Sequence, residues 1–211
     1  MNLNIKDLRL EIGSAVINFS CESPALILIQ DDRATFLFQT LMGLTRPQQG
    51  QITFGKHILT SSTGKQLDIW QKGRLGVQYL PSPRITFPSL TTAQTLKLVA
   101  QNNLKHRISL ESLYREIPLL SDIRNRRIWQ LSGGQQQILS LICCFTAQSR
   151  LLMLEEPFVG ISLPMQKVIS AKLIAHLLTT PAIALYYTTQ PLPSFLLENL
   201  QGIFLHHLRL V

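Results

Sequence analysis

The sequence predicts an α/β fold built on a mostly parallel sheet with helices on both faces. The run Ala25–Ile29 is typical of a buried strand, and a helix is expected from Thr35 to Met42 directly after it. Two further strands, Leu151–Leu154 and Ala182–Tyr187, flank a helix expected near Pro164–Leu178. Strand–helix–strand order with fully apolar strands is typical of parallel sheets, whose two faces are both covered.

Two other regions should add to this sheet. The stretch Leu8–Phe19 is β-rich and alternates in polarity near its end, which favours an antiparallel β part near the N-terminus. Helical patterns at Thr91–Gln101 and Leu110–Ile117, together with the segment that continues to Arg127, indicate a small helical insert. No linker, repeat or low-complexity tract divides the 211 residues, so we expect one large domain.

The composition is apolar for a soluble monomer. Hydrophobic residues make up 45% of the chain and charged residues only 15%, and the mean hydropathy is +0.17. These values predict surfaces that other molecules cover. No apolar run reaches the roughly 18 residues that span a bilayer, and Met1–Asp7 does not resemble a signal peptide. We therefore expect a cytoplasmic protein.

A net charge of +8 and a pI near 9.8 suggest nucleic acid or an anionic membrane as partners. The charges cluster at Lys105–Arg107 and Arg124–Arg127, without interleaved aromatic residues or a groove-binding motif, which makes nucleic acid the less favoured partner. A solvated basic face without a partner is the alternative. Three cysteines and the pair His206–His207 fit neither a disulfide framework nor a metal site, so no metal ligands are predicted.

The most informative motif is LSGGQ at Leu131–Gln135. It opens an apolar run from Ile138 to Ile142, so the two glycines should lie at a helix N-terminus with free backbone amides. Such a terminus suits a phosphate oxygen, and Ser132 would add a hydroxyl. Taken alone, the same residues also fit an ordinary serine N-cap that follows a turn.

The separation between LSGGQ and the run Leu151–Pro157 resembles that between the signature motif and the Walker B strand of ABC-type ATPases. Further segments are similar to the same family: Gly43–Ile52 to the segment after the P-loop helix, Gly76–Thr91 to the Q-loop region, and Thr188–Leu192 to the switch segment. The resemblance covers most of the chain. It implies a P-loop NTPase-like fold, with a single ABC-type ATPase domain over residues 1–211 and residues 91–130 as its helical subdomain.

The family pattern places the P-loop at Leu28–Thr35, and only Thr35, the magnesium-binding hydroxyl, agrees with G-x-x-x-x-G-K-[ST]. A P-loop needs glycine amides in a concave nest and a lysine that balances phosphate charge. Here Arg33 and Ala34 replace the glycine and the lysine, and Asp31 and Asp32 add negative charge. Like charges near 4 Å cost about 4 kcal/mol at an effective dielectric of 20. The sequence therefore predicts a degenerate P-loop that binds nucleotide weakly or not at all.

The remaining catalytic positions implied by the resemblance are partly retained. Glu155 replaces the Walker B aspartate and could reach Mg²⁺ through water, and Glu156 is the expected general base, although it lies in a degenerate site. The Q-loop glutamine falls on Ser82, and the switch histidine falls on Thr189 or Gln190. A simpler interpretation treats the two glutamates as a solvated acidic turn at a strand end.

The resemblance, together with the degenerate P-loop, implies an ABC-type subunit that donates its signature to a composite ATP–Mg²⁺ site. A second ABC ATPase chain would supply the working P-loop, and a membrane permease would hold both at the inner face of the membrane. The predicted nucleotide-contacting residues are Ser132, Gly133, Gly134, Gln135, Thr35 and Glu155. The alternatives are an active homodimeric ATPase and a non-catalytic scaffold or regulator.

Overall fold

The computed structural model describes residues 1–82, 87–101 and 109–210. Its strands are β1 (Asn2–Arg9), β2 (Ile17–Glu22), β3 (Ala25–Ile29), β4 (Gln49–Phe54), β5 (His57–Ser61), β6 (Val77–Leu80), β7 (Leu151–Glu155), β8 (Ile183–Tyr187) and β9 (Phe204–Leu208). Its helices are α1 (Ala34–Met42), α2 (Ile69–Leu75), α3 (Thr92–Gln101), α4 (Leu110–Glu116), α5 (Pro118–Asp122), the 3₁₀ helix η1 (Ile128–Gln130), α6 (Gly133–Thr146), α7 (Leu163–Thr179) and α8 (Ser194–Leu197).

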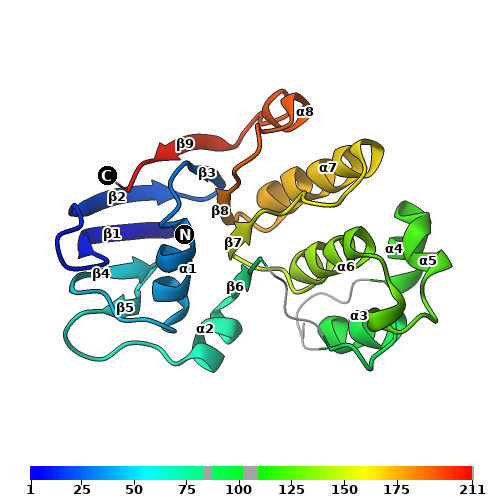
Figure 1. The fold of residues 1–211 in the computed structure, drawn as a ribbon, viewed down its shortest axis with the longest axis horizontal. Helices are drawn as coiled ribbons and strands as arrows, with labels where there is room; N and C mark the ends of the chain where they lie inside the picture. The colour runs from blue at the N-terminus through cyan, green and yellow to red at the C-terminus, as the bar shows by residue number, and fades with distance from the viewer. Residues whose placement is uncertain (83–86, 102–108, 211) are drawn as a thin grey trace.

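Two sheets organise the chain. A parallel sheet has the strand order β6-β7-β8-β3-β9, and an antiparallel sheet has the order β2-β1-β4-β5. Figure 1 shows the antiparallel sheet on one side of the parallel strands and the helices α3 to α7 on the other. The predicted α/β class, with a parallel sheet, an N-terminal antiparallel part and helices, is confirmed. The subdomain boundaries at 91 and 130 stay a prediction.

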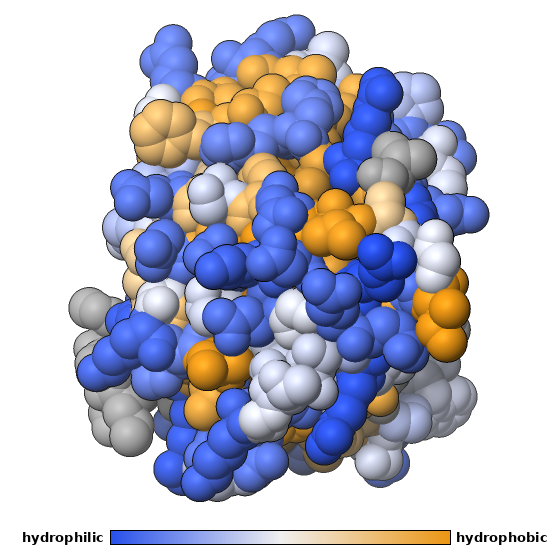
Figure 2. Space-filling view, turned by 90° about the vertical axis from the view of Figure 1, so that its left-hand side faces the viewer, coloured by the Kyte–Doolittle hydropathy of each residue, from blue (hydrophilic) through white to orange (hydrophobic). Residues whose placement is uncertain are grey.

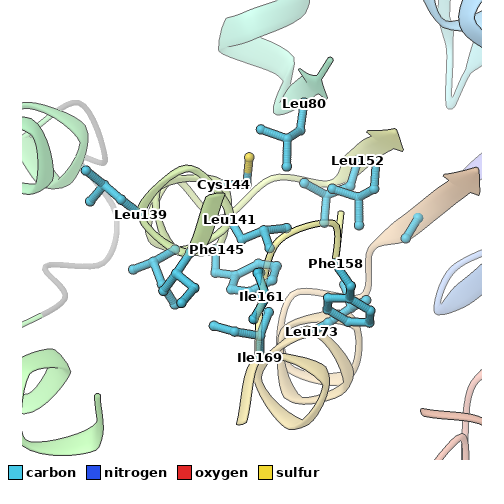
Figure 3. Close-up of a cluster of buried hydrophobic side chains, with 14 of the residues drawn as sticks. Leu80, Leu139, Leu141, Cys144, Phe145, Leu152, Phe158, Ile161, Ile169 and Leu173 are labelled. Carbon is cyan, nitrogen blue, oxygen red and sulfur yellow. The ribbon is translucent and has the colours of Figure 1, made fainter. Parts of the chain in front are cut away.

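The parallel sheet is buried on both faces, and its side chains alternate between two cores. In β3, Leu26 and Leu28 contact the core formed with α6 and α7, whereas Ile27 and Ile29 contact the core formed with α1 and the antiparallel sheet. Figure 3 shows the first core, where side chains of α6, β7 and α7 meet. This double burial explains why the strand is apolar at every position.

One expectation about the N-terminal region was wrong. The stretch Leu8–Phe19 was expected to be β-rich, but β1 ends at Arg9 and β2 begins only at Ile17. Gly13 has φ +84°, and the amide of Ser14 donates to the carbonyl of Glu11 at 3.1 Å. This turn interrupts the β pattern, because a left-handed glycine reverses the chain.

Some large apolar side chains lie on the surface, among them Ile12, Phe87 and Trp129. Figure 2 shows a face on which hydrophilic and hydrophobic atoms are mixed, with an orange area at its upper edge. The described residues contain no helix long and apolar enough to cross a membrane.

Candidate functional site

The candidate site lies where three parallel strands end. Ile29 at the end of β3 pairs with Tyr187 at the end of β8, and Tyr187 pairs in turn with Glu155 at the end of β7. The carboxyl ends of parallel strands share one edge of the sheet, which is where α/β proteins bind ligands. The topology therefore brings the predicted P-loop, Walker B and switch segments together.

The loop between β3 and α1 is filled by its own ion pair. The guanidinium of Arg33 donates two hydrogen bonds to the carboxylate of Asp31, at 2.9 and 2.8 Å, and the Arg33 amide donates to the same carboxylate at 3.0 Å. These hydrogen bonds from Arg33 lower the pKa of Asp31 to about 2. The carboxylate of Asp31 thus accepts a hydrogen bond from the amide of Arg33, the N-cap residue of α1.

The next residue of the predicted P-loop, Thr35, contacts the Walker B position directly. Its hydroxyl donates to Oε1 of Glu155 at 2.6 Å. The other carboxylate oxygen accepts from the hydroxyl of Tyr79 at 2.5 Å and from the amide of Ser82 at 3.3 Å. Burial, together with this hydrogen bond to Glu155, raises the pKa of Tyr79 above its usual range. Protein donors therefore engage both oxygens of Glu155.

Glu156 is held by the segment after β8. Its carboxylate accepts from the hydroxyl of Thr188 at 2.7 Å, and from the amide and hydroxyl of Thr189, each at 2.6 Å. Burial opposes ionisation, but the hydrogen bonds from Thr189 and Thr188 outweigh it and lower the pKa of Glu156. Glu156 also has φ 46°, an uncommon conformation for a residue with a side chain. The three hydrogen bonds from Thr188 and Thr189 therefore favour the ionised carboxylate.

The LSGGQ residues form a second group at the start of α6. Ser132 is the N-cap: its hydroxyl accepts from the amide of Gln135 at 3.3 Å, and the Gln135 side chain accepts from the Ser132 amide at 3.0 Å. Ser132 and Gly133 are exposed. A Cβ atom on Gly134 would lie 2.2 Å from the carbonyl oxygen of Gly160, so packing within the chain already requires glycine there. The ordinary N-cap interpretation is thus also satisfied.

Two side chains of this region were not predicted. Tyr79 lies on β6, in the segment similar to the Q-loop region, and its hydroxyl had no visible signal in the sequence. Gln137 lies one turn into α6, and its amide donates to the carbonyl oxygens of Pro157 at 3.0 Å and Glu156 at 3.4 Å. Gln137 precedes the apolar run Ile138–Ile142 as the last of three glutamines, so the sequence did not distinguish it from the two before it, although its side chain is buried in the fold.

Other predicted features have mixed outcomes. Both Thr188 and Thr189 contact Glu156, whereas the amide of Gln190 donates to Thr188. The basic cluster Lys105–Arg107 lies outside the described residues, while Arg124–Arg127 is exposed. Among the described residues there is no group of three or more His, Cys, Asp or Glu side chains that could hold a metal ion.

Comparison with known proteins now identifies the family. The family model described as "ABC transporter" matches residues 34–159, more than half of the chain. This chain belongs to the ABC transporter family. It is 27% identical over 128 residues to a probable branched-chain amino acid transport ATP-binding protein LivF from Archaeoglobus fulgidus, a match that covers 60% of this chain and 52% of that protein.

Other relatives carry different transport names. The chain is 28% identical over 154 residues to the Fe(3+) ions import ATP-binding protein FbpC of Serratia marcescens, covering 71% of this chain and 42% of that one. It is 29% identical over 129 residues to the cytochrome c biogenesis ATP-binding export protein CcmA of Tatumella citrea, covering 60% and 56%. The chain thus spans about half the length of the curated relatives it matches.

Solved structures confirm the fold. A putative ABC transporter ATP-binding protein from Pyrococcus furiosus superposes with a TM-score of 0.72 at 14% identity, over 100% of this chain and 98% of the other. An ATP-binding subunit of an ABC transporter superposes with a TM-score of 0.71 at 20% identity, over 89% and 79%. The architecture is that of an ABC ATP-binding domain.

Proposed function

We propose that this chain is a catalytically impaired nucleotide-binding subunit of a membrane transporter. Its own P-loop would stay empty or weakly occupied, and its LSGGQ motif would complete the ATP–Mg²⁺ site of a partner ABC ATPase. A permease would hold both chains at the inner face of the membrane. The observation that carries this proposal is the contact between Asp31 and Arg33 in the loop before α1.

This contact opposes phosphate binding in two ways. The Asp31 carboxylate already accepts the hydrogen bond of the Arg33 amide. A phosphate oxygen bound at this loop would need that amide as a donor. The Arg33 guanidinium, the cation nearest to this loop in sequence, is engaged by the same carboxylate. Asp32 is exposed beside them and adds a second negative charge. The match to the family model begins at residue 34 and leaves this loop out.

The Glu155 contacts support the same conclusion for the metal. A Walker B carboxylate orients water on Mg²⁺, and Mg²⁺ itself is held largely by the phosphates and a P-loop hydroxyl. Here the hydroxyl of Thr35 donates to Glu155 at 2.6 Å, and Tyr79 donates to the other oxygen. A metal at this position would have to displace satisfied hydrogen bonds. The hydrogen bonds from Thr35 and Tyr79 therefore disfavour a metal ion at the Glu155 carboxylate.

The signature, in contrast, is free to act on a partner. Ser132 and Gly133 are exposed at the N-terminus of a 14-residue helix. The dipole and the unpaired amides of such a terminus attract phosphate oxygens. If the nucleotide arrives on another chain, this terminus can donate to it without any contribution from Asp31 or Arg33.

The permease contact is proposed at two exposed aromatic residues, Phe87 in the segment after β6 and Trp129 in η1. Phe87 and Trp129 are each 63% exposed, and the Trp129 amide donates to the carbonyl of Pro88 at 3.4 Å. A groove for a permease helix at Ser82–Leu90 would require that Phe87 and Ile85 are exposed. Phe87 is exposed, and Ile85 lies outside the described residues. Large aromatic side chains left in water mark an interaction surface.

One observation favours a second candidate, an active homodimeric ATPase. Glu156 lies at the general-base position and is held ionised by Thr188 and Thr189. An ionised, oriented carboxylate is what a general base requires. Under this alternative the purified chain binds and hydrolyses ATP without a partner.

The first experiment is calorimetry of the purified chain with magnesium-ATP. The proposal expects no binding at micromolar ATP and no hydrolysis. Tight stoichiometric binding would establish the homodimer instead. Restoring a lysine at Ala34 is a poor positive control, because Ala34 is fully buried against Leu37 and Phe38.

The second experiment compares variants within the complex that is co-purified through a tag on this chain. Ser132→Asp places a carboxylate against the partner's phosphate, while Ser132→Asn is the matched neutral control, and both residues are good N-caps. We expect Asp to lower ATPase activity at least about 100-fold, since opposed charges at a dry interface cost several kcal/mol. Asn should retain most of the activity.

The third variant separates the two sites. Glu156→Gln should leave the activity of the complex nearly unchanged if this chain's own site is inactive. Loss of activity in Glu156→Gln together with full activity in Ser132→Asp would reverse the assignment. Gly134→Asp cannot serve here, because any side chain at Gly134 collides with Gly160.

A further inference from the structure

The short helix α2 presents its apolar side chains to water. Ile69 is 49% exposed and Trp70 is 59% exposed, and Gly73 and Arg74 lie on the same exposed side of the helix. The opposite side is anchored by Lys72, which is fully buried and donates to the carbonyl of Leu41 at 2.9 Å. The solvent face of α2 is therefore fixed in its orientation and carries the residues that would normally point inward.

The other residues of this face fit a surface contact. The Arg74 guanidinium carbon lies 5.2 Å from the centre of the Trp70 ring, a cation–π distance. Nothing lies within 4 Å of a Cβ atom built on Gly73, so packing inside the chain does not explain the glycine. A helical glycine is destabilising relative to alanine. Because Gly73 has no side chain, the helix surface one turn after Trp70 is left uncovered.

The sequence segment that contains α2 carries a net positive charge. Residues 43–80 contain five basic residues and one acidic residue, Asp68. The basic residues are Arg46, Lys56, Lys65, Lys72 and Arg74. All of these except Lys72 are exposed. Leu44, which is 58% exposed, follows Gly43, and a Cβ atom built on Gly43 would lie 2.7 Å from Nζ of Lys72. Leu44 is therefore a third exposed apolar residue whose backbone lies near Lys72 of α2.

We propose that the exposed face of α2 (Ile69, Trp70, Gly73 and Arg74) binds an anionic lipid surface. Tryptophan is enriched at membrane interfaces, where its indole lies at the headgroup level, and an arginine near the surface is attracted to anionic lipids. A protein partner fits less well, since stable protein interfaces bury about 800 Å² on each side and this seven-residue helix offers two large apolar side chains. The contact is independent of the proposed nucleotide pairing.

The two tryptophans of the chain allow a direct test. Trp129→Phe leaves Trp70 as the only indole, and Trp70→Phe leaves Trp129, which at 63% is about as exposed as Trp70 at 59% and serves as the matched control. Each variant is titrated with vesicles of phosphatidylglycerol and brominated phosphatidylcholine, and with vesicles of brominated phosphatidylcholine alone. We expect a blue shift and quenching of Trp70 with the anionic vesicles only. Unchanged Trp70 emission would overturn the proposal, as would equal quenching of Trp70 and Trp129, which indicates non-specific adsorption of a basic protein.

Vesicle sedimentation of surface variants gives a second measure. Arg74→Gln should weaken partitioning about fivefold, the loss expected for one cation near an anionic surface, and Trp70→Gln should weaken it about tenfold. Phe204→Gln is the control, because Phe204 is 61% exposed on β9 and outside α2. Circular dichroism verifies that each variant is folded. Equal partitioning of Trp70→Gln and the parent chain would refute the assignment, as would a loss in Phe204→Gln as large as that in Trp70→Gln.

Discussion

The backbone of Gly134 packs directly on the carbonyl oxygen of Gly160, which would lie 2.2 Å from a Cβ atom on Gly134. Gly160 itself has φ +76°, so both partners of this contact need glycine. The contact joins the start of α6 to the segment between β7 and α7. It fixes the exposed end of the LSGGQ helix relative to Glu156 through packing alone.

Gly134→Ala should therefore lower the free energy of unfolding by about 1–3 kcal/mol, the usual cost of an inserted methyl group that the surroundings cannot accommodate. Gly73→Ala is the matched control, since it is also a helical glycine but has open space around its Cβ. It should raise stability by about 0.5–1 kcal/mol. Urea denaturation of both variants measures the difference, and a Gly134→Ala protein as stable as the parent would contradict the contact.

Removing Asp31 should weaken the start of α1. Asp31→Ala loses the acceptor of the Arg33 amide, and we expect a loss of about 1 kcal/mol. Asp31→Asn can still accept the amide and should lose less. The folded pKa near 2 lies below the unfolded value, so the ionic part of this stabilisation is present above about pH 4 and disappears as the pH falls toward 2. Thermal unfolding between pH 3 and 7 tests this, and equal stability of all three proteins at pH 7 would refute it.

Lys72 should give the chain an alkaline pH dependence. Burial lowers its pKa from 10.5 to about 8. The unfolded chain then binds more protons between these values, so the Lys72 contribution to stability rises as the pH increases from 8 to 10. Relative to Lys72→Met, which lacks the titrating group, the parent should gain roughly 2 kcal/mol over this range. Chemical denaturation at pH 7, 8, 9 and 10 measures the gain, and a constant difference between the two proteins would exclude a shifted lysine.

Thr189→Val should raise the pKa of Glu156. The valine removes one hydroxyl donor from the carboxylate but keeps the shape and the backbone amide. Hydrogen bonds to the ionised form are what offset burial, so losing one disfavours ionisation. Carboxyl ¹³C chemical shifts followed against pH report this value. Thr180→Val, outside the site, is the control, and identical titration curves for Glu156 in both variants would argue against the contact.

The sequence predicted the central sheet well because its signals are local. The strands Ala25–Ile29 and Leu151–Leu154 lie between two cores and are apolar throughout, and such short apolar runs are typical of buried parallel strands. The helix near Thr35 followed from its apolar pattern directly after a buried strand, and the helix start at Gly133 followed from Ser132 and the two glycines. The missed elements, such as β9 and α2, are short and half-exposed, so their composition carries little pattern.

The site was only partly predictable for a different reason. Motif spacing correctly placed Thr35 near Glu155, since both positions follow strands of one sheet. The hydroxyl of Tyr79 and the pairing of Asp31 with Arg33 depend on side-chain directions that spacing does not encode. The role of Gly134 was assigned to phosphate from the motif, whereas its contact with Gly160 requires the fold.

The position of β3 has a consequence for how the chain is made. β3 lies between β8 and β9, so both of its hydrogen-bonding neighbours come from the far end of the sequence. During synthesis the apolar strand β3 is completed long before the segments that form β8 and β9. Such long-range pairing slows folding and exposes a strand that can aggregate. Until β8 and β9 are synthesised, β3 therefore presents two unpaired edges that can pair with other chains.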